Sequence, residues 1–318
     1  MISFSGVAKR YGPVWALRGV SFSVPKKRIV GLLGQNGAGK TTALNILTGC
    51  SPSSKGCVQI GGFDIRDKPR DAKRLMGYLP EKPPLYDEMT VYRYLRFVCE
   101  LKEVSKRSIR AHIDEIIALT GLEEMCYRRI AVLSKGYRQR VGIAQSLCGA
   151  PEVLVLDEPT IGLDPRQITE IRALISKLGQ THTVLFSSHI LTEVQQLCQR
   201  VIILHQGLKV LESDMCDLDD NPGCKRLRVV AGIHQSALLP AVRGLECVVQ
   251  TELAAAADRE TEMILTVRRD MQPERKLFTL LAGLDAPILS LAPVRDTLED
   301  VFLRVTSGEE TVQEGDAR

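Results

Sequence analysis

Two short segments carry residue types that suit phosphate chemistry. Residues 34–41 read Gly-Gln-Asn-Gly-Ala-Gly-Lys-Thr and match the pattern GxxxxGK[ST], directly after an apolar run. Glycines let backbone N–H groups wrap a phosphate, and a helix that begins at the end of such a loop adds positive potential. The segment therefore predicts a phosphate-binding loop. It disfavours a dinucleotide fold, because the glycines do not follow the spacing GxGxxG.

The side chains of this loop have separate predicted roles. Lys40 is expected to reach the β- and γ-phosphates, Thr41 to ligate Mg²⁺ through its hydroxyl, and Thr42 to contact the α-phosphate. The other predicted cofactor-binding residues line the loop with their backbones. They are Gly34, Gln35, Asn36, Gly37, Ala38 and Gly39.

A second segment ends an apolar run in two adjacent carboxylates. Residues 153–159 read Val-Leu-Val-Leu-Asp-Glu-Pro. Asp157 is placed to hold Mg²⁺, directly or through a water, and Glu158 to orient and deprotonate an attacking water. Acidic residues often begin the turn after a strand, so the pair is a weak signal by itself. Combined with the phosphate loop, it indicates nucleotide hydrolysis.

Three further motifs follow in a fixed order and carry a family resemblance. Residues 133–140 read LSKGYRQR and resemble the LSGGQ signature of the ATP-binding cassette (ABC) ATPases. Residues 162–165 (GLDP) resemble the D-loop of that family, and residues 187–189 (SSH) resemble its H-loop. With the two segments above and an aromatic residue, Tyr11, upstream of them, the resemblance covers residues 1–211.

The resemblance implies an ATP site shared between two such domains, with ATP and Mg²⁺ as cofactors. Ser134 and Gly136 would meet the γ-phosphate held by the partner protomer, and Asp164 of the D-loop would also bind the nucleotide. His189 would contact the γ-phosphate and position the water, and Tyr11 would stack on adenine. The implied catalytic residues are Glu158, His189 and Lys40. The implied metal ligands are Thr41, Glu81 and Asp157.

Some of these residues have simpler interpretations, which stay open at this point. Ser134 is also a good helix N-cap, and His189 taken alone is more often a satisfied core histidine. Trp15 competes with Tyr11 as the adenine platform. The loop from Glu81 to residue 86 could be an ordinary rigid surface loop.

The chain departs from the family pattern at three places. In the signature, Lys135 replaces the first Gly and Tyr137 replaces the Gln. Glu81 stands at the Q-loop position, where many relatives have Gln, and a carboxylate can still hold Mg²⁺ or its water. Residues 79–97, the signature and residues 298–306 together resemble the ATP-binding subunits of ABC-2-type exporters. That branch includes gliding-motility, copper-site-maturation and multidrug or antibiotic efflux systems.

The elements that must position these motifs alternate between strands and helices, which predicts an α/β fold with a mainly parallel sheet. A helical insertion covers residues 90–148, and a small antiparallel β part is expected near the N-terminus. The predicted strands cover residues 2–5, 20–24, 28–33, 152–156, 183–187 and 201–205. The predicted helices begin near Gly39 and cover residues 166–178 and 190–198.

The remaining residues predict a second, smaller domain. Residues 217–223 are rich in turn formers, and residues 212–223 are expected to be a linker after a nucleotide-binding domain of residues 1–211. Residues 224–307 show the order β-α-β-β-α-β of a ferredoxin-like α+β domain, followed by a helix over residues 298–305. This accessory domain could be regulatory, a dimer brace or inert. Residues 308–318 are expected to fray.

Composition restricts the partners. The 318 residues are 44% hydrophobic and 25% charged, with no apolar run of 18 residues and no secretory signal. Nine scattered cysteines without a CxxC pair suggest reduced thiols. We therefore expect a cytoplasmic protein, peripheral to the inner face of the cell membrane. Transport would need a separate integral-membrane permease, docked beside residues 81–86, and a second nucleotide-binding domain in a homodimer.

Charge leaves an alternative function open. Residues 1–211 carry 30 Lys and Arg against 18 Asp and Glu, whereas residues 212–318 carry 12 against 20. A basic first part suits an anionic ligand, which could be a nucleotide, a nucleic acid or a lipid surface. The alternative is a soluble ABC ATPase acting on nucleic acid or ribosomes. One phosphate loop, no coiled-coil run and no CxxC pair favour transport, so nucleic acid is not an expected partner.

Overall fold

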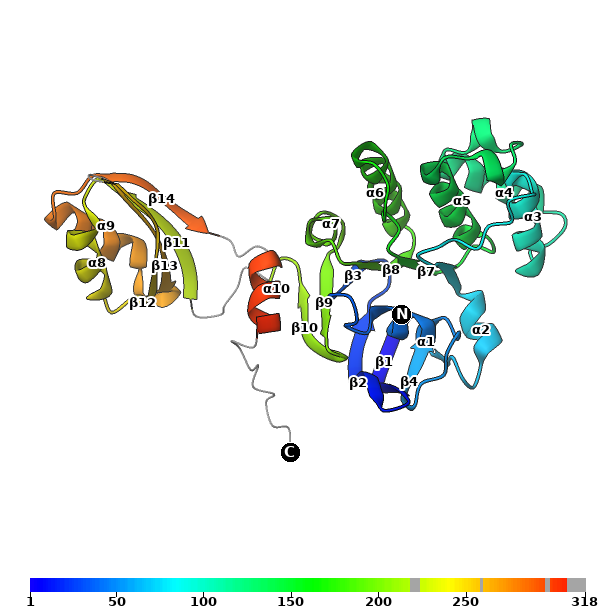
Figure 1. Ribbon diagram of the computed structural model, residues 1–318, viewed down its shortest axis with the longest axis horizontal. Coiled ribbons are helices and arrows are strands. Elements are labelled where there is room, and N and C mark those ends of the chain that lie inside the picture. The colour runs from blue at the N-terminus through cyan, green and yellow to red at the C-terminus, as the bar shows by residue number, and fades with distance from the viewer. Residues whose placement is uncertain (218–223, 258–259, 295–297, 308–318) are drawn as a thin grey trace. The chain divides into compact units, whose positions relative to one another are not determined.

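The computed structural model describes residues 1–217, 224–257, 260–294 and 298–307 of the chain (Figure 1). The chain divides into two compact units, one made mainly of Met1–Met215 and the other of Cys216–Arg304. Among the described residues, no helix combines the length and the apolar character that crossing a membrane requires. Each unit is described separately below.

A six-stranded sheet forms the centre of the first unit, and its strands are parallel apart from β10, which runs antiparallel to β9. This confirms the predicted mainly parallel α/β sheet. In β3 and β7 every residue is buried, as expected for strands covered on both faces. Across the sheet the strands are β10 (Leu208–Asp214), β9 (Arg200–His205), β3 (Ile29–Leu33), β8 (Thr183–Ser188), β7 (Val153–Asp157) and β6 (Met76–Leu79).

A second, four-stranded sheet is antiparallel and comes from the N-terminal part of the chain, as predicted. Helix α1 (Lys40–Leu47) contacts strands of both sheets, and buried residues of α1 and of both sheets form one hydrophobic core. The sequence reading missed β4 and β5 and made β1 too short. The strands are, in order, β2 (Val14–Val24), β1 (Ile2–Tyr11), β4 (Lys55–Ile60) and β5 (Phe63–Asp64).

The predicted helical insertion consists of α3, α4 and α5, which contact one another and lie together in Figure 1. Its helices form because apolar residues recur at helical spacing, as in the buried stripe of Ile109, Ile113 and Ile116. Helix α7 covers the six-stranded sheet and comes so close that a Cβ on Gly31 of β3 would lie 2.5 Å from Val194. The helices are α2 (Pro69–Arg74), α3 (Val91–Leu101), α4 (Ile109–Thr120), α5 (Lys135–Leu147), α6 (Pro165–Gly179) and α7 (Leu191–Leu197).

The second unit has the predicted ferredoxin-like fold. Its strands form one antiparallel sheet in the order β12-β13-β11-β14, and buried residues of α8 and α9 share a core with it. In chain order its elements are β11 (Cys224–Ala231), α8 (Gln235–Arg243), β12 (Val248–Ala256), β13 (Thr261–Arg268), α9 (Pro273–Gly283) and β14 (Ile288–Val294). Helix α10 (Leu298–Ser307) follows.

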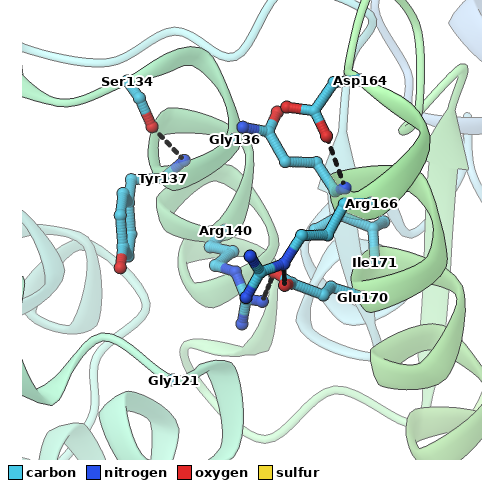
Figure 2. Close-up of a pocket in the computed structure, with 10 residues that line it drawn as sticks. Gly121, Ser134, Gly136, Tyr137, Arg140, Asp164, Arg166, Glu170 and Ile171 are labelled. Carbon is cyan, nitrogen blue, oxygen red and sulfur yellow. Dashed lines mark hydrogen bonds and ion pairs between the residues drawn. The ribbon is translucent and has the colours of Figure 1, made fainter.

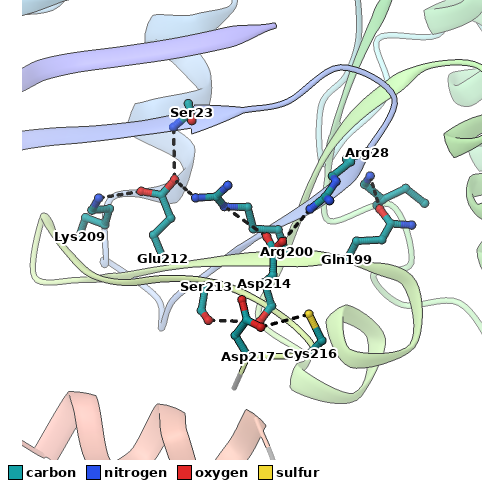
Figure 3. Close-up of polar contacts among 11 residues, drawn as sticks. Ser23, Arg28, Gln199, Arg200, Lys209, Glu212, Ser213, Asp214, Cys216 and Asp217 are labelled. Atoms are coloured by element: carbon teal, nitrogen blue, oxygen red, sulfur yellow. Dashed lines mark hydrogen bonds and ion pairs between the residues drawn. The ribbon is translucent and has the colours of Figure 1, made fainter. Parts of the chain in front are cut away.

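The last strand of the first unit extends three residues into the segment expected to be a linker. Polar contacts hold this end of β10 (Figure 3): Arg28 donates to Asp214 at 2.8 Å, and Arg200 donates to Glu212 at 2.9 Å. Both carboxylates lie on a strand that pairs with β9, and each is bound by an arginine, Arg28 just before β3 or Arg200 on β9. Residues 215–217 of the expected linker form a turn, whereas its residues 218–223 and the expected frayed tail, residues 308–318, lie outside the described residues.

Candidate active site

The predicted phosphate loop joins the end of β3 to the first residue of α1. Gly39 caps the helix with φ 108°, in the left-handed region, and a Cβ at this position would lie 2.7 Å from the backbone oxygen of Ala16. A residue with a side chain could not adopt this turn without moving the backbone, so glycine is required here. The loop therefore delivers Lys40 directly at the helix N-terminus.

Lys40 is buried in a polar environment. Its ammonium group donates to the backbone oxygen of Gly34 at 2.6 Å and lies 4.0 Å from Oε1 of Glu158. Burial lowers the pKa of Lys40, while the charges of Glu158 and Asp157 oppose that shift. The ammonium of Lys40 thus lies beside a loop whose backbone N–H groups can form an anion-binding concavity.

The other residues of the loop differ in exposure, and some of them stay accessible to a ligand. Gly34 and Ala38 are buried and hold the loop in place. Thr42 is half-buried at the first turn of α1. The exposed residues are Gln35, Asn36, Gly37 and Thr41.

The two adjacent carboxylates follow the buried strand β7. Asp157 ends the strand with 4% of its surface exposed, and Glu158 comes next with 8% exposed. Burial raises the pKa of Asp157, the charges of Glu158 and Glu81 raise it further, and Lys40 lowers it. Asp157 and Glu158 are thus two adjacent, poorly exposed carboxylates, and carboxylate oxygens suit a bound cation.

Glu158 adopts a backbone conformation that residues other than glycine rarely adopt. Its φ is +47°, and its N–H donates to the backbone oxygen of Ser187 at 3.1 Å. Strain of this kind persists only where the surroundings enforce it, and it is common at active sites. Here it turns the residue out of β7 toward the end of β8.

His189 contacts the same carboxylate from the neighbouring strand. Its Nδ1 lies 2.8 Å from Oε2 of Glu158, although 31 residues separate the two in sequence. The parallel pairing of β7 with β8, which sets Asp157 opposite Ser187, brings these strand ends together. The carboxylate of Glu158 thus lies between an ammonium group and an imidazole.

The predicted signature and D-loop residues cap two helices. Ser134 is the N-cap of α5 and accepts a hydrogen bond from the N–H of Tyr137, and Asp164 is the N-cap of α6 and accepts one from the N–H of Gln167 at 2.9 Å. Gly136 lies so close to Gln167 that a Cβ there would be 2.7 Å from that side chain. The simpler interpretation of Ser134 as an N-cap is therefore correct, and it leaves room for a second role.

These residues line a polar cavity of about 390 Å³ (Figure 2). Figure 2 shows Ser134 and Tyr137 on one side, Asp164 on the other, and Arg140 and Arg166 around the carboxylate of Glu170. Arg140 donates to Glu170 at 2.7 Å and Arg166 donates to it at 3.2 Å. The lining comes from α5, α6 and the segments next to them, and it includes none of the phosphate-loop residues. The sequence reading missed the pair Arg140–Glu170.

Both candidate adenine platforms are on the hairpin of β1 and β2. Tyr11 has 48% of its surface exposed, and Lys9 lies 4.9 Å from its ring. Trp15 has 37% of its surface exposed, and Arg10 lies 5.7 Å from its ring. The geometry of the hairpin leaves both rings available.

The site also contains buried polar groups that the sequence reading did not single out. Thr160, Ser188 and Glu193 are each at most 2% exposed and lie directly beside the segments that carry Glu158 and His189. A charged residue next to apolar Val194 in a short amphipathic helix was the only signal for Glu193 in the sequence.

Comparison with known proteins gives consistent matches. Residues 17–161 match the family model described as ABC transporter. The linearmycin resistance ATP-binding protein LnrL of Bacillus subtilis (strain 168) is 31% identical over 317 residues, covering 96% of this chain and 98% of that protein. The bacitracin transport ATP-binding protein BcrA of Bacillus licheniformis is 30% identical over 312 residues, covering 97% and 98%.

A solved structure extends these matches to three dimensions. The ATP-binding cassette MJ0796, dimeric and in a post-hydrolysis state bound to ADP and Pi, superposes with a TM-score of 0.62 and 25% identity. The superposition covers 68% of this chain and 99% of that one.

Proposed function

Because this chain belongs to the ABC transporter family of ATP-binding proteins, we propose that it is the ATPase subunit that powers an ABC-2-type exporter. The relatives whose names state resistance or transport support export as the process. The single observation that carries hydrolysis is the position of the Glu158 carboxylate, 4.0 Å from the ammonium of Lys40 and 2.8 Å from Nδ1 of His189.

In this proposal Glu158 is the general base. It accepts a proton from the water that attacks the γ-phosphorus, so that a new P–O bond forms while the bond to the bridging oxygen of ADP breaks. His189 holds the carboxylate in place through its ring nitrogen and contacts the γ-phosphate. Lys40 neutralises charge on the β- and γ-phosphates.

The residues proposed to hold Mg²⁺ fit that ion. Asp157, Glu81 and Thr41 all offer oxygen ligands, which Mg²⁺ prefers. Burial and the charges of Glu158 and Glu81 raise the pKa of Asp157, and a nearby cation would favour its ionised form. When bound, Mg²⁺ would supply positive charge opposite the phosphates.

A second nucleotide-binding domain, in a homodimer, completes the proposed site. Ser134, Gly136 and Asp164 line an open cavity that the phosphate loop does not reach, so they are available to the nucleotide of a partner copy. Tyr11 is proposed to stack on adenine. A dimeric solved structure of similar fold supports this arrangement.

The proposed docking site for the integral-membrane permease is the loop after β6. Tyr86 is 54% exposed, and its ring lies 6.0 Å from that of Tyr94 and 5.6 Å from that of Phe97. The hydroxyl of Tyr94 donates to the backbone oxygen of Pro84 at 3.2 Å, which holds the loop against α3. We also propose that the protein works at the inner face of the cell membrane, where such a permease would hold it.

The remaining assignments concern the rest of the chain. We propose residues 1–211 as the catalytic domain, with the strand β10 completing it, and residues 224–307 as an accessory domain. The alternative of an ATPase acting on nucleic acid or ribosomes gains no support from the relatives named above.

Hydrolysis by the full-length chain tests the catalytic assignment. Release of phosphate from ATP should require Mg²⁺, stop with EDTA and be lost in the Lys40→Ala variant, together with much of the ATP affinity. Lys26→Ala is the matched control, because Lys26 is 72% exposed and forms only a 3.8 Å ion pair with Glu152. Unchanged affinity and turnover in Lys40→Ala would refute the phosphate-loop assignment.

Docking to the permease is tested separately. A membrane protein with several apolar spans should co-purify with the full-length chain and be lost on Tyr86→Asp. Leu101→Asp, at the far end of α3 and 67% exposed, should retain it. Retention by Tyr86→Asp would exclude this loop as the docking site without affecting the assignment of ATP hydrolysis.

A further inference from the structure

Behind the candidate active site lies a carboxylate that the proposed reaction does not use. Glu193, in the first turn of α7, has 0% of its surface exposed. A buried charge costs folding free energy unless it is paired and hydrogen-bonded, so its contacts are informative. They come from both of the segments that carry the reacting side chains.

One oxygen of Glu193 accepts hydrogen bonds from two loops. The hydroxyl of Thr160 donates to Oε2 at 2.8 Å, and the hydroxyl of Ser188 donates to the same atom at 3.1 Å. Thr160 follows Glu158 by two residues, and Ser188 directly precedes His189. A single carboxylate oxygen therefore ties the loop of Glu158 to the loop of His189.

The contacts around these hydroxyls extend the tie to the backbone. The Ser188 hydroxyl also accepts from the N–H of Ile190 at 3.0 Å, which fixes the turn on both sides of His189. The N–H of Ile161 donates to the backbone oxygen of Glu158 at 3.2 Å, which closes the turn that contains Thr160. A hydrogen bond therefore closes each of the two turns, and each turn contains a residue that Glu193 binds, either Thr160 or Ser188.

The other oxygen of Glu193 faces a cation. Arg172 of α6 places its guanidinium 3.5 Å from Oε1, and that group also donates to the side chain of Gln196. No hydrogen bond within the described residues reaches Oε1. The attraction at Oε1 is therefore electrostatic, and it needs the negative charge of Glu193.

We propose that Glu193 is a positioning residue for ATP hydrolysis, which holds Glu158 and His189 at their mutual distance by binding Thr160 and Ser188 at once. This inference rests on the proposed function and deepens it. Glu193 touches neither reacting atoms nor substrate. Its effect reaches the reaction through the 2.8 Å contact between His189 and Glu158.

The Glu193→Gln variant tests the proposal with almost no change of shape. The amide of Gln has one oxygen that accepts hydrogen bonds and one NH₂ group that only donates them. The NH₂ group must therefore face either the hydroxyls that Oε2 binds in the wild type or the guanidinium of Arg172. We expect kcat to fall by about 10-fold to 10²-fold, because displacements of about 1 Å at an active site have effects of this size. The KM for ATP should change by less than about twofold, since the phosphate loop is untouched.

Two milder variants separate positioning from folding. Thr160→Val and Ser188→Ala each remove one of the two hydroxyl donors and should each lower kcat, whereas Thr160→Ser keeps the hydroxyl and should restore it. Glu212→Gln is the matched control for loss of a poorly exposed, ion-paired carboxylate, because Glu212 binds Arg200 and Lys209 away from these loops. It should lower stability and leave kcat unchanged.

A double-mutant comparison decides whether Glu193 acts through the catalytic pair. In a Glu158→Gln background, Glu193→Gln should cause no further loss of turnover, because the group that it positions is already inactive. The proposal is overturned if kcat of Glu193→Gln stays within about twofold of the wild type, or if the two losses multiply. Wild-type turnover and its loss in Glu158→Gln establish the proposed function independently, so the two failures are distinguishable.

Discussion

The two sets of nucleotide-site residues differ in how far their own chain surrounds them. Lys40, Asp157 and Glu158 are at most 8% exposed, and the ammonium of Lys40 lies 4.0 Å from the carboxylate of Glu158. Ser134 and Asp164 instead cap separate helices at the mouth of an open cavity. The first set is built to hold charge in place before a ligand arrives, and the second is built to present polar groups to a ligand held elsewhere.

This difference has a physical basis in the elements that carry each set. The first set sits where β3, β7 and β8 end, and neighbouring strands fix the distances between these ends. The second set sits at the N-termini of α5 and α6, whose unpaired N–H groups and dipoles favour an anion. If both sets serve one composite site, substitutions in the two sets should differ in the property that they impair as well as in the size of their effect.

The largest effect is expected in the buried set, from Glu158→Gln. The substitution keeps the shape of the side chain and removes its ability to take a proton, so turnover should fall by at least about 10²-fold. ATP binding should persist, and a dimer with trapped nucleotide should accumulate. Single-turnover phosphate release and sedimentation with ATP measure the two properties.

A conservative change at the opposite end of β7 serves as the control. Glu152→Gln alters an acidic residue just before β7, 3.8 Å from Lys26 and in a well-exposed pair. It should leave turnover unchanged. Near-normal hydrolysis in Glu158→Gln would remove Glu158 as the general base.

The comparison between the two sets predicts complementation between defective chains. Ser134→Arg should block the exposed set, and Lys40→Ala should disable the buried set. Each variant alone should be inactive, but a mixture forms heterodimers that contain one intact composite site. Turnover of an equimolar mixture should recover to about a quarter of the wild-type value if the exchange of subunits is random and sites act independently.

The mixing experiment has an internal control. The control mixture combines two variants of the buried set, Lys40→Ala and Glu158→Gln. Both chains retain intact signature residues, and each chain has one substitution in its buried set. Their heterodimer has a defect in each site and should stay inactive. No recovery in the mixture of Ser134→Arg with Lys40→Ala would instead show that each chain builds its site alone, contrary to the composite arrangement.

Sequence reasoning predicted the parts of the fold that depend on local pattern. The parallel strands that lead to the phosphate loop and to Asp157 could be predicted because they are apolar runs buried on both faces. The order of elements in the second unit was also readable, because alternation and turn formers mark each boundary. Neither pattern depends on contacts distant in sequence.

Contacts between distant residues could not be read in the same way. The extension of β10 to Asp214 depends on Arg28, which is 186 residues away, and a cluster of acidic residues with turn formers looks the same as a linker. The burial of Glu193 depends on hydroxyls from two other loops. Local propensity cannot show that a charged residue will find partners of this kind.

A smaller effect is expected from the aromatic rings of the N-terminal hairpin. If Tyr11 stacks on adenine, Tyr11→Ala should weaken ATP affinity by about three- to tenfold, which corresponds to the energy of an aromatic contact. Trp15→Ala should then change it little. A titration with ATP and with inorganic triphosphate separates base stacking from phosphate binding, because triphosphate has no ring. The opposite ranking would make Trp15 the platform.

The smallest effect on nucleotide binding is expected from removal of the second unit. The described residues proposed to bind nucleotide all lie before Asp217, so a chain ending at Asp217 should bind ATP within about twofold of the full-length affinity. Dimerisation or coupling to the permease should weaken, and salt should reduce any part that depends on attraction between the acidic and basic units. Sedimentation and ATP titration of the truncated chain measure both properties.

Truncation after Leu211 is the informative comparison, because it removes the last three residues of β10. Asp214 and Glu212 would be lost as partners of Arg28 and Arg200, and β9 would lose part of the strand that covers its edge. These pairs are partly exposed, so we expect a loss of stability of about 1–2 kcal/mol, visible as a lower midpoint of urea unfolding. ATP affinity measured well below that midpoint should match the chain that ends at Asp217. Loss of ATP binding in a folded chain that ends at Asp217 would instead show that the second unit contributes to the nucleotide site.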